Sequence, residues 1–349
     1  MPFLRVDPSD ADAVASSVDI LNAAMEVDDP TSPRQLTAVE AKFLRYGWDL
    51  EPAERYLYVP PGERYAVGVL DLEVPTRDNT HLIWASLTVR PELRRRGHGT
   101  ALMNETIRRT QAMGRTTLWV GVAADEPASR AFVARFGFRQ ASSDARRRQV
   151  LADVDRDATA RLFAQARQAA ADYDVERLPS PVGDDELVEL VEVTAAINDA
   201  PMGELTYEDE VFDVARLRDM QTARAGIGDR MYRVVARSRA TGRIAAHTLT
   251  VLNPLRPTFA FQGDTAVARE HRGHKLGLLV KLEMMTWLAE AEPQIETIET
   301  FNNVSNSFMI DVNEAIGYRL SRLYDIHERP VEADTTVEES AGELTAAQG

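Results

Sequence analysis

Two stretches of the chain share one uncommon pattern, in which an apolar run meets a turn rich in arginine and glycine and then continues in helix-forming residues. They read LTVRPELRRRGHGTALM, from Leu87 to Met103, and TAVAREHRGHKLGLLVK, from Thr265 to Lys281. With Arg94 and Arg272 taken as equivalent positions, the two copies lie 178 residues apart, which is the length of an ordinary domain. Because the chain has 349 residues, the repeat predicts two domains of the same fold.

The order of elements expected around each copy is also the same. Runs of β-branched and aromatic residues predict strands, apolar residues at helical spacing predict helices, and Ser9 or Asp10 is a suitable N-cap for the first helix. In the first half, strands are expected at 3–8, 55–59, 65–74, 81–89, 116–122 and 137–140, and helices at 9–25, 34–47, 100–112 and 126–136. In the second half, strands are expected at 175–181, 231–239, 242–252, 258–267, 295–301 and 317–328, and helices at 184–199, 212–225, 278–291 and 306–315.

This order predicts an α/β protein of the α+β type, in which two domains each have a mixed, mostly antiparallel sheet flanked by helices. We expect the first domain at 1–150 and the second at 175–330. The polar, alanine-rich segment 151–174 predicts a connecting helix between them. The small and acidic residues of 331–349 predict a loose tail.

Composition excludes several kinds of chemistry. The chain has no cysteine, which excludes disulfides, thiolate metal sites and a cysteine nucleophile, and its six histidines form no HxH or HxxxH pair, so no metal site is predicted. A net charge of −15 disfavours nucleic-acid binding and mildly favours amine-bearing small partners. No apolar run approaches the roughly 20 residues needed to cross a bilayer, and the first residues lack signal-peptide features, so we expect a cytoplasmic protein that does not bind membranes.

The turn at Arg94–Gly99 has the chemistry of a phosphate site. Backbone N–H groups at the start of a helix point toward the positive end of the helix dipole, and glycine lets an anion approach them closely. No Gly-Lys-Ser/Thr of a Walker A loop follows, and no GxGxxG is present. The turn therefore predicts a pyrophosphate cradle, and a second copy in the same setting makes a merely solvated basic turn an unsatisfactory explanation.

At these residues the chain resembles the GNAT acetyltransferase superfamily, whose Arg/Gln-x-x-Gly-x-Gly/Ala turn holds the pyrophosphate of coenzyme A. Arg94, Gly97 and Gly99 fill the three specified positions. The segments ARFGFRQ and EAIGYRL resemble the closing element of the superfamily, and their glycines, Gly137 and Gly317, follow the turn arginines by 43 and 45 residues. The resemblance covers nearly the whole chain as a tandem pair.

The resemblance implies an acetyl-CoA-dependent N-acetyltransferase that moves an acetyl group to a primary amine of a small molecule and releases coenzyme A. It also implies a set of cofactor-binding residues at the end of the strand before each turn, in the turns themselves and in the asparagine-rich segment of the second half. These are Leu87, Thr88, Val89, Arg94, Arg95, Arg96, Gly97, His98, Gly99, Thr100, Ala266, Val267, Arg272, Gly273, His274, Lys275, Gly277, Asn302 and Asn306.

Two positions depart from the superfamily pattern. Lys275 stands where the central glycine of the second turn is usual; it either takes helical or bridge geometry and meets a phosphate itself, or it obstructs the cradle. Many members have a tyrosine four residues before the closing glycine as general acid, where this chain has Asn313 and, in the first half, Val133. Asn306 matches the cofactor-contacting asparagine, and Glu126 replaces it in the first half.

The implied reaction needs a base, because a protonated amine has no lone pair with which to attack a thioester. A leaving thiolate has a pKa near 8.5, so proton donation to it helps without being obligatory. Asp264, just before the second turn, is the preferred base. His247, His81 and Glu73 are the other candidate bases near the strands that precede the two turns. The candidate catalytic residues are Asp264, Asn313 and Ser129.

Of the two halves, the second is expected to be catalytic, and the first to bind cofactor or support a shared cleft. Three alternatives stay open. One is an enzyme similar to mycothiol synthase, with a sugar–cysteine amine as acceptor. Another is a non-catalytic acyl-CoA-binding protein, and the third is a nucleic-acid-associated protein that uses the clusters Arg94–Arg96 and Arg146–Arg148, which the net charge opposes. The protein is expected to be a monomer or homodimer.

Overall fold

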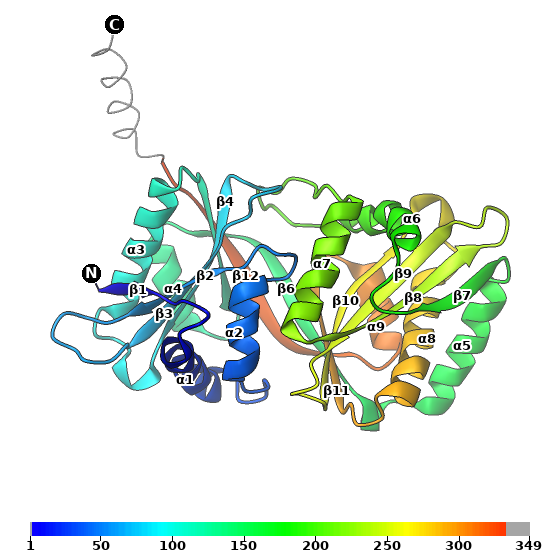
Figure 1. Cartoon of the computed structure of the whole chain (residues 1–349), viewed down its shortest axis with the longest axis horizontal. Helices are drawn as coiled ribbons and strands as arrows, with labels where there is room; N and C mark the ends of the chain where they lie inside the picture. The colour runs from blue at the N-terminus through cyan, green and yellow to red at the C-terminus, as the bar shows by residue number, and fades with distance from the viewer. Residues whose placement is uncertain (1, 333–349) are drawn as a thin grey trace, which may run out of the picture.

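The computed structural model describes residues 2–332, so the expected tail at 331–349 lies outside the described residues from position 333 onward. Within that range twelve strands form one sheet in the order β1-β2-β3-β4-β5-β12-β6-β11-β10-β9-β8-β7, and helices cover both of its faces (Figure 1). Most neighbouring strands are antiparallel, and β4 with β5 and β10 with β11 are parallel. The predicted class, mixed and mostly antiparallel strands flanked by helices, is confirmed.

The elements of the first half follow the expected order. Asp10 is the N-cap of α1, and its carboxylate accepts hydrogen bonds from the backbone N–H groups of Asp12 and Ala13. The elements are β1 (Phe3–Arg5), α1 (Ala11–Asp28), α2 (Thr37–Tyr46), β2 (Glu54–Tyr58), β3 (Gly68–Glu73), β4 (Leu82–Val89), η1 (Pro91–Leu93), α3 (His98–Ala112), β5 (Thr117–Ala123), α4 (Pro127–Arg135) and β6 (Arg139–Val150).

The second half repeats this order after a short 3₁₀ turn and a helix in the segment expected to connect the domains. The elements are η2 (Leu151–Asp153), α5 (Arg156–Ala169), β7 (Tyr173–Leu178), α6 (Asp184–Ala195), η3 (Ala196–Asp199), α7 (Val214–Ile227), β8 (Arg230–Ser238), β9 (Ile244–Leu252), β10 (Phe259–Val267), η4 (Arg269–His271), α8 (Leu276–Ala291), β11 (Thr297–Asn303), α9 (Ser307–Ala315) and β12 (Arg319–Pro330). Leu162 and Phe163 of α5 pack against the core beneath α8, so this helix is part of the second half.

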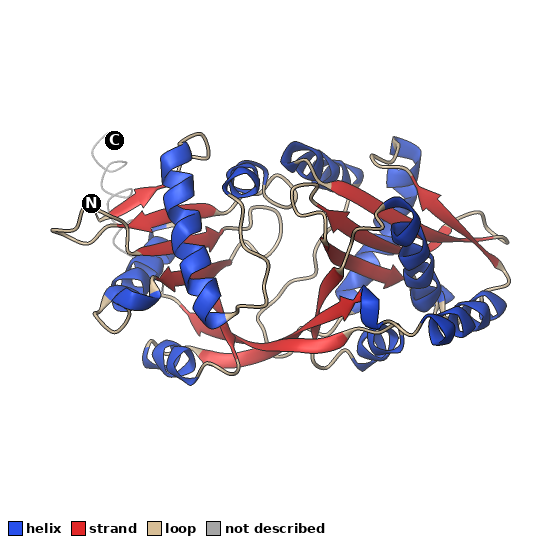
Figure 2. Cartoon of the chain, turned by 90° about the horizontal axis from the view of Figure 1, so that it is seen from below, coloured by secondary structure: helices blue, strands red, loops and turns tan. Residues whose placement is uncertain are grey.

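The two halves exchange their last strands, which the sequence did not indicate. β12, from the end of the second half, lies antiparallel to β5 of the first half, with Glu328 opposite Trp119. β6, from the first half, lies antiparallel to β11 of the second, with Arg148 opposite Glu299, and β6 and β12 pair with each other in the middle. These long strands run across the centre of the molecule (Figures 1 and 2). The halves are therefore joined by a hydrogen-bonded ladder as well as by the chain.

Each half has apolar cores of its own beneath the helices that cover the two faces of the sheet. In the first half Leu70, Ile83 and Leu118 are buried against Leu102 of α3. In the second half strand β9 is buried along its whole length, and residues of α8 pack over it. Burial of such side chains is the main favourable term in folding. In each half a strand, β4 or β10, is followed by a short turn and then by a helix, α3 or α8.

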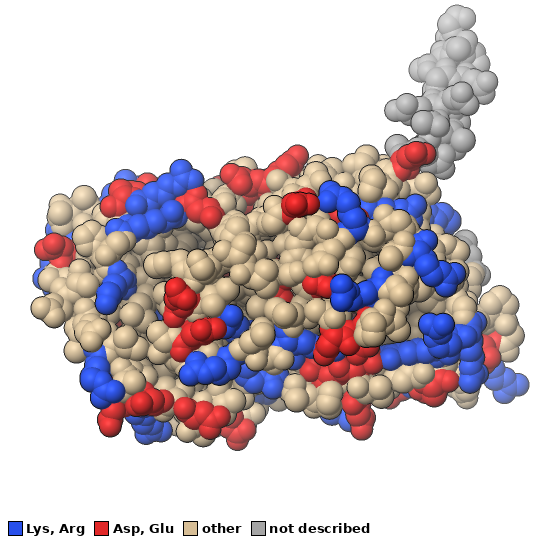
Figure 3. Space-filling view, turned by 180° about the vertical axis from the view of Figure 1, so that it is seen from behind, with Lys and Arg blue, Asp and Glu red and all other residues tan. Residues whose placement is uncertain are grey.

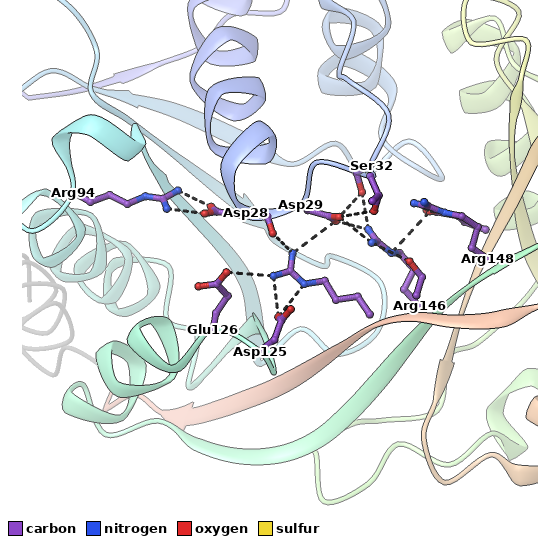
Figure 4. A network of polar contacts seen from close by, with 12 residues as sticks. Asp28, Asp29, Ser32, Arg94, Asp125, Glu126, Arg146 and Arg148 are labelled. Carbon is purple, nitrogen blue, oxygen red and sulfur yellow. Dashed lines mark hydrogen bonds and ion pairs between the residues drawn. The ribbon is translucent and has the colours of Figure 1, made fainter.

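A network of ion pairs lies where α1 ends against the exchanged strands (Figure 4). Arg146 of β6 is 4% exposed and donates to Asp29 at 2.6 Å and to the hydroxyl of Ser32 at 2.7 Å. Burial of Asp29 opposes ionisation, but the hydrogen bonds from Arg146 and Ser32 outweigh it and lower the pKa of Asp29 to about 2. Arg148 pairs with Glu299 of β11. Arg146 and Arg148 of the β6 cluster therefore form ion pairs within the protein.

The surface carries charges of both signs side by side. On the face seen in Figure 3, arginine and lysine side chains alternate with aspartate and glutamate rather than forming a broad basic field. Within residues 2–332, no helix combines the length and the apolar character that a membrane crossing requires.

Candidate active site

A cavity of about 680 Å³ lies between the two halves of the chain. Its volume is that of a pocket for a small ligand. The second half contributes the middle of β10, the end of β11 and α9, and the first half contributes the ends of β3, β4 and β5. The segment 197–216, between α6 and α7, completes the wall.

Strand β10 is distorted where it lines this cavity. Gln262 pairs with Thr250 of β9 but Thr265 pairs with Thr248, so one extra residue on β10 forms a bulge at Gly263 and Asp264. The amide of Gln262 holds the bulge in place by donating to the hydroxyl of Thr248 at 2.9 Å and to the carbonyl of Leu249 at 2.7 Å. A bulge leaves backbone groups outside the ladder, so they are free to meet a ligand.

The neighbouring strand β11 separates from β10 at the same level. The two are paired in parallel only from Phe259 opposite Thr297 to Phe261 opposite Glu299, and beyond these residues both strands continue without pairing to each other. The separated parts of both strands, with an opening between them, line the cavity, and β10 continues from there to the turn before α8. An extended ligand that enters at the turn before α8 can therefore reach the cavity between the two strands.

The first half has the opening but not the bulge. Strands β4 and β5 pair only from Leu82 opposite Thr117 to Ala85 opposite Val120, while β4 keeps an unbroken register with β3 from Gly68 to Glu73. Trp84 and Trp119 face each other across β4 and β5 with ring centroids 5.8 Å apart. These indoles belong to the wall of the cavity, so the first half presents an aromatic surface to it.

The two turns have the same backbone path but exchange their glycines. In the first, Arg95 has φ +63° and Gly97 φ +90°, and at the equivalent positions of the second, Gly273 has φ +88° and Lys275 φ +57°. Lys275 is therefore in left-handed geometry, and the expectation of helical or bridge geometry is wrong. The turn requires a positive φ at that position, which a lysine adopts with some strain and glycine without it.

The arginines of the turns brace the backbone. Nε of Arg94 donates to the carbonyl of Val89 at 3.2 Å, and Nε of Arg272 donates to that of Val267 at 3.3 Å. The other nitrogens of Arg94 form a bidentate pair with Asp28 at 2.6 and 2.7 Å, and this carboxylate raises the pKa of Arg94.

In the second turn Asp199 forms the ion pair with the turn arginine that Asp28 forms in the first. The guanidinium groups of Arg269 and Arg272 hold the pKa of this carboxyl well below its usual range. Both turn arginines are thus fixed by a carboxylate, from the last residue of α1 in the first half and from the last residue of η3, which follows α6, in the second. The backbone N–H groups remain as phosphate donors in both turns, and the exposed ammonium of Lys275 adds one in the second.

The helix starts after both turns are open to an anion. Neither α3 nor α8 has a side chain that caps its first N–H groups. Gly99 and Gly277 are the second residues of these helices, and a Cβ added to either would meet no atom closer than 3.5 Å. Of the other expected cofactor contacts, Leu87, Thr88, Val89, Ala266 and Val267 end the strands before the turns, and Arg96, His98, Thr100 and His274 lie in the turns or at the helix starts.

Asp264 lies in the bulge and in the wall of the cavity. Burial raises the pKa of this carboxyl, an effect that Arg233 opposes and Glu210 reinforces. A carboxylate with a raised pKa is a stronger base than an exposed one. The structure therefore brings the preferred base to the cavity.

The asparagines of the second half also meet there. Asn313 is fully buried, and its Nδ2 donates to Oδ1 of Asn302 at 2.7 Å. Oδ1 of Asn313 has no hydrogen-bond partner among the described residues, and both side chains line the cavity. Asn306 lines it too, but its Oδ1 caps α9 by accepting from the N–H of Met309 at 3.2 Å. An amide at position 313 is a hydrogen-bonding group and cannot act as the acid that a tyrosine would be.

The remaining candidates lie elsewhere or have other partners. Ser129 is exposed on α4 and is absent from the cavity wall. His247 is fully buried on β9, where its Nδ1 accepts from Arg233 at 2.8 Å; burial and then Arg233 lower its pKa well below 6.5, so it stays neutral. Nε2 of His81 lies 3.1 Å from the carbonyl of Thr206.

Lys281 is the residue of the site that sequence reasoning missed. It is 2% exposed on α8, it lines the cavity, and its ammonium lies 5.3 Å from the centre of the Tyr318 ring. Burial alone lowers the pKa of Lys281 to about 7. The signal was a single lysine within the apolar run LGLLVKL, because a lysine rarely occupies the buried face of a helix without a function.

Comparison with known proteins agrees with this architecture. Residues 19–138 match the model of the acetyltransferase (GNAT) family. Mycothiol acetyltransferase of Acidothermus cellulolyticus is 28% identical over 207 residues, which are 59% of this chain and 58% of the relative's length.

Solved structures match over a longer range. A tandem GNAT protein from the clavulanic acid biosynthesis pathway superposes with a TM-score of 0.78 at 24% identity, over 95% of this chain and 99% of that one. A GCN5-related N-acetyltransferase from Sphaerobacter thermophilus matches with a TM-score of 0.67 at 15% identity, over 95% and 96% of the two chains.

Residues 19–138 are therefore similar to the acetyltransferase (GNAT) family. The first half of the chain contains the domain that the family model matches, and the whole chain has the fold of a tandem GNAT protein.

Proposed function

We propose that the protein is an acetyl-CoA-dependent N-acetyltransferase whose second half carries out the reaction on a small-molecule amine. The observation that carries this proposal is the position of the cavity, which lies against the β10 bulge with Asp264 in its wall. The first half lacks a bulge in β4, and at the position equivalent to Asp264 it has Ser86 in an unbroken ladder.

The second turn fits the pyrophosphate of acetyl-CoA. Its helix start is uncapped, Gly277 leaves room for close approach, and Lys275 is exposed beside the turn, where its ammonium is available to a phosphate. Arg272 and Arg269 are engaged by Asp199, so they support the turn and add positive charge near it. The opening between β10 and β11 then leads the pantetheine arm toward Asp264.

Acetyl-CoA supplies an activated acetyl thioester, and the residues of the chain supply proton transfer and positioning. Asp264 takes the proton of the amine, whose nitrogen bonds to the acetyl carbon as the carbon–sulfur bond breaks. The backbone N–H groups freed by the bulge are suited to the carbonyl oxygen of the thioester. Lys281, with a pKa of about 7, gives a proton to the sulfur in place of the tyrosine that position 313 lacks.

The first half serves this site as a wall. Trp84 and Trp119 present their rings to the cavity, and Trp119 is held by a hydrogen bond of 2.8 Å from its Nε1 to Glu328 of the exchanged strand β12. Its own turn has the features of a second cofactor cradle, so acetyl-CoA binding there without turnover is compatible with this role. We expect the enzyme to act in the cytoplasm as a monomer or homodimer.

The proposal is tested by introducing one negative charge into each cradle in turn. Gly277→Glu and Gly99→Glu put a carboxylate at the second residue of α8 and α3, where it repels a pyrophosphate and suits the helix dipole. Melting temperatures establish that both variants fold, and calorimetry measures acetyl-CoA binding. Because the chain has no cysteine, a thiol reagent reports released coenzyme A without background from the protein.

We expect Gly277→Glu to abolish turnover and Gly99→Glu to leave it within about twofold of the parent. The reverse result would assign the reaction to the first half. Absence of acetyl-CoA binding by the folded parent protein would refute the acetyltransferase proposal, and binding without turnover on any amine would favour an acyl-CoA-binding protein.

A second candidate follows from the relative named mycothiol acetyltransferase. Since the match covers 58% of that protein, the same acceptor is a hypothesis to be tested alongside other amines. Turnover of the mycothiol precursor at least tenfold above that of simple amines, measured as kcat/KM, would favour it.

A further inference from the structure

Three carboxylates in the wall of the cavity have no cationic partner. Glu73 ends β3, Asp144 is on β6 and Asp264 is in the β10 bulge. Among residues 2–332, none of the three forms an ion pair within 4.0 Å with a lysine, arginine or histidine. The one hydrogen bond to their side chains comes from Nδ2 of Asn303 to Asp144 at 3.3 Å.

The other carboxylates of the wall form ion pairs with two arginines. Arg216 lies 2.7 Å from Asp78, 2.9 Å from Glu210 and 3.4 Å from Asp49. Arg77 lies 3.9 Å from Glu51. The cavity wall therefore contains two groups of acidic residues. One group is paired with arginines, and the other, Glu73, Asp144 and Asp264, is left for a ligand to pair with.

Leaving these carboxylates unpaired has an energetic consequence. Burial raises the pKa of Asp144 and of Asp264, so their ionised forms are destabilised in the cavity wall, whereas Glu73 at the end of β3 is exposed. A cation that entered the cavity would remove part of this penalty. Lys281 provides little compensation, since burial lowers its pKa to about 7.

Two further features of the wall suit an organic cation. Aromatic side chains line the cavity on several sides, among them Trp48, Trp84, Trp119 and Phe261, and ring faces attract ammonium and guanidinium groups. The buried Oδ1 of Asn313 is an acceptor with no donor among the described residues, and an N–H of a ligand would supply one. Carboxylates, ring faces and a free carbonyl oxygen together favour a ligand that is rich in N–H groups.

We propose that the acceptor carries at least one positive charge in addition to the amine that is acetylated, so that the substrates are small diamines or polyamines. This inference rests on the proposed acetyltransferase function. The reacting amine must be neutral and meets Asp264, while further cationic groups are attracted by Glu73 and Asp144, which lie on strands separated by β4, β5 and β12. The two roles need separate carboxylates, because one that has accepted the proton of the amine no longer attracts a cation.

Matched pairs of amines test the proposal on the full-length protein with acetyl-CoA. The linear pair is 1,4-diaminobutane and 4-amino-1-butanol, and the cyclic pair is 1,4-diaminocyclohexane and 4-aminocyclohexanol. Within each pair the probes differ only in the second charged group. Turnover is followed by coenzyme A release, and binding of each probe is measured separately by calorimetry.

We expect the diamine of at least one pair to exceed its amino alcohol at least tenfold in kcat/KM and in affinity, and the better pair distinguishes a flexible from a ring-shaped acceptor. Glu73→Gln and Asp144→Asn should each reduce that ratio severalfold. Glu63→Gln, an exposed carboxylate away from the cavity wall, is the control and should change neither.

The possible outcomes separate this inference from the proposed function. Equal turnover of diamine and amino alcohol in both pairs would overturn the inference and leave the acetyltransferase intact. Preferential binding of a diamine that depends on Glu73 and Asp144, without turnover of any amine, would support the cation site and overturn the proposed reaction. A preference that survives both substitutions would show that these carboxylates do not hold the second charge.

Discussion

Replacing Lys281 by methionine tests whether a titratable group has been buried at the expense of stability. The position 178 residues earlier is Met103, which is fully buried in the core of the first half, so the change installs the residue that the fold uses at the equivalent site. Lys281 is 2% exposed, and among residues 2–332 the contact of its ammonium is with the Tyr318 ring at 5.3 Å and not with a hydrogen-bond acceptor. We therefore expect Lys281→Met to be more stable than the parent at neutral pH.

The magnitude follows from the lowered pKa. A pKa of about 7 in the folded protein, against 10.5 for an ordinary lysine, means that the unfolded chain binds one more proton between these two pH values. The penalty on folding is therefore present in full below pH 7 and disappears as the pH rises past 10.5. At 1.4 kcal/mol for a tenfold change in proton affinity, the free energy of unfolding is lowered by roughly 4 kcal/mol at pH 7 and by less than 1 at pH 10.5.

Guanidinium unfolding of the parent and of Lys281→Met, at pH 7 and again at pH 10, measures this difference. The gain in unfolding free energy should be several kcal/mol at pH 7 and should shrink toward the packing difference between the two side chains at pH 10. A gain of equal size at both pH values would mean that packing, and not the buried amine, is responsible. No gain at pH 7 would mean that the ammonium reaches water through the cavity, and the proposed proton donor would then have an ordinary pKa.

Three further results are expected. The same Lys281→Met variant should lose about tenfold in kcat, because a thiolate can leave without a proton donor but leaves more slowly; an unchanged kcat and pH profile would remove Lys281 from the mechanism. Asp264→Asn should lower kcat/KM about 10²- to 10³-fold at neutral pH while calorimetry gives the parent affinity for acetyl-CoA, and parent-like turnover would point to another base. Arg146→Ala should lower the free energy of unfolding by about 2 kcal/mol, since it removes the charged hydrogen bonds of the half-buried Asp29, which keeps the longer ion pair with Arg322 at 3.8 Å; the control Arg34→Ala, 72% exposed with a 3.9 Å ion pair, should stay within about 0.5 kcal/mol, and equal effects would refute the argument.

Local sequence signals were sufficient for most of the secondary structure and for the two turns. Strands with β-branched residues and a helix capped by Asp10 depend on contacts within a few residues, which a sequence displays directly. The positive φ at Lys275 was not predicted, because a lysine gives no local signal for it. The second turn follows the same backbone path as the first, where glycine occupies that position. The exchange of β6 and β12 was not predictable either, since each strand pairs equally well by pattern with its own half.

The same distinction applies to the candidate site. Asp264 and the asparagines were identified because they lie close in sequence to recognisable motifs. Lys281 is also only a few residues from the turn, but its role depends on what surrounds it after folding. Glu73 and Asp144 come from β3 and β6, far from Asp264 in sequence, and they share a cavity only because the two halves face each other. Ser129 had the right residue type, but α4 holds it away from the cavity.

The strand exchange makes the first half, which lacks the bulge, part of the sheet and of the cavity of the second half. β6 is the neighbour of β11 along seven residues, from Asp144 opposite Asn303 to Val150 opposite Thr297, and β11 forms one side of the opening beside Asp264. Without the first half, β11 would become an unpaired edge and the cavity would lose Trp84, Trp119 and the carboxylates of β3 and β6. The first half therefore contributes to the second in two ways that a separate domain could not, by completing its sheet and by building its acceptor wall.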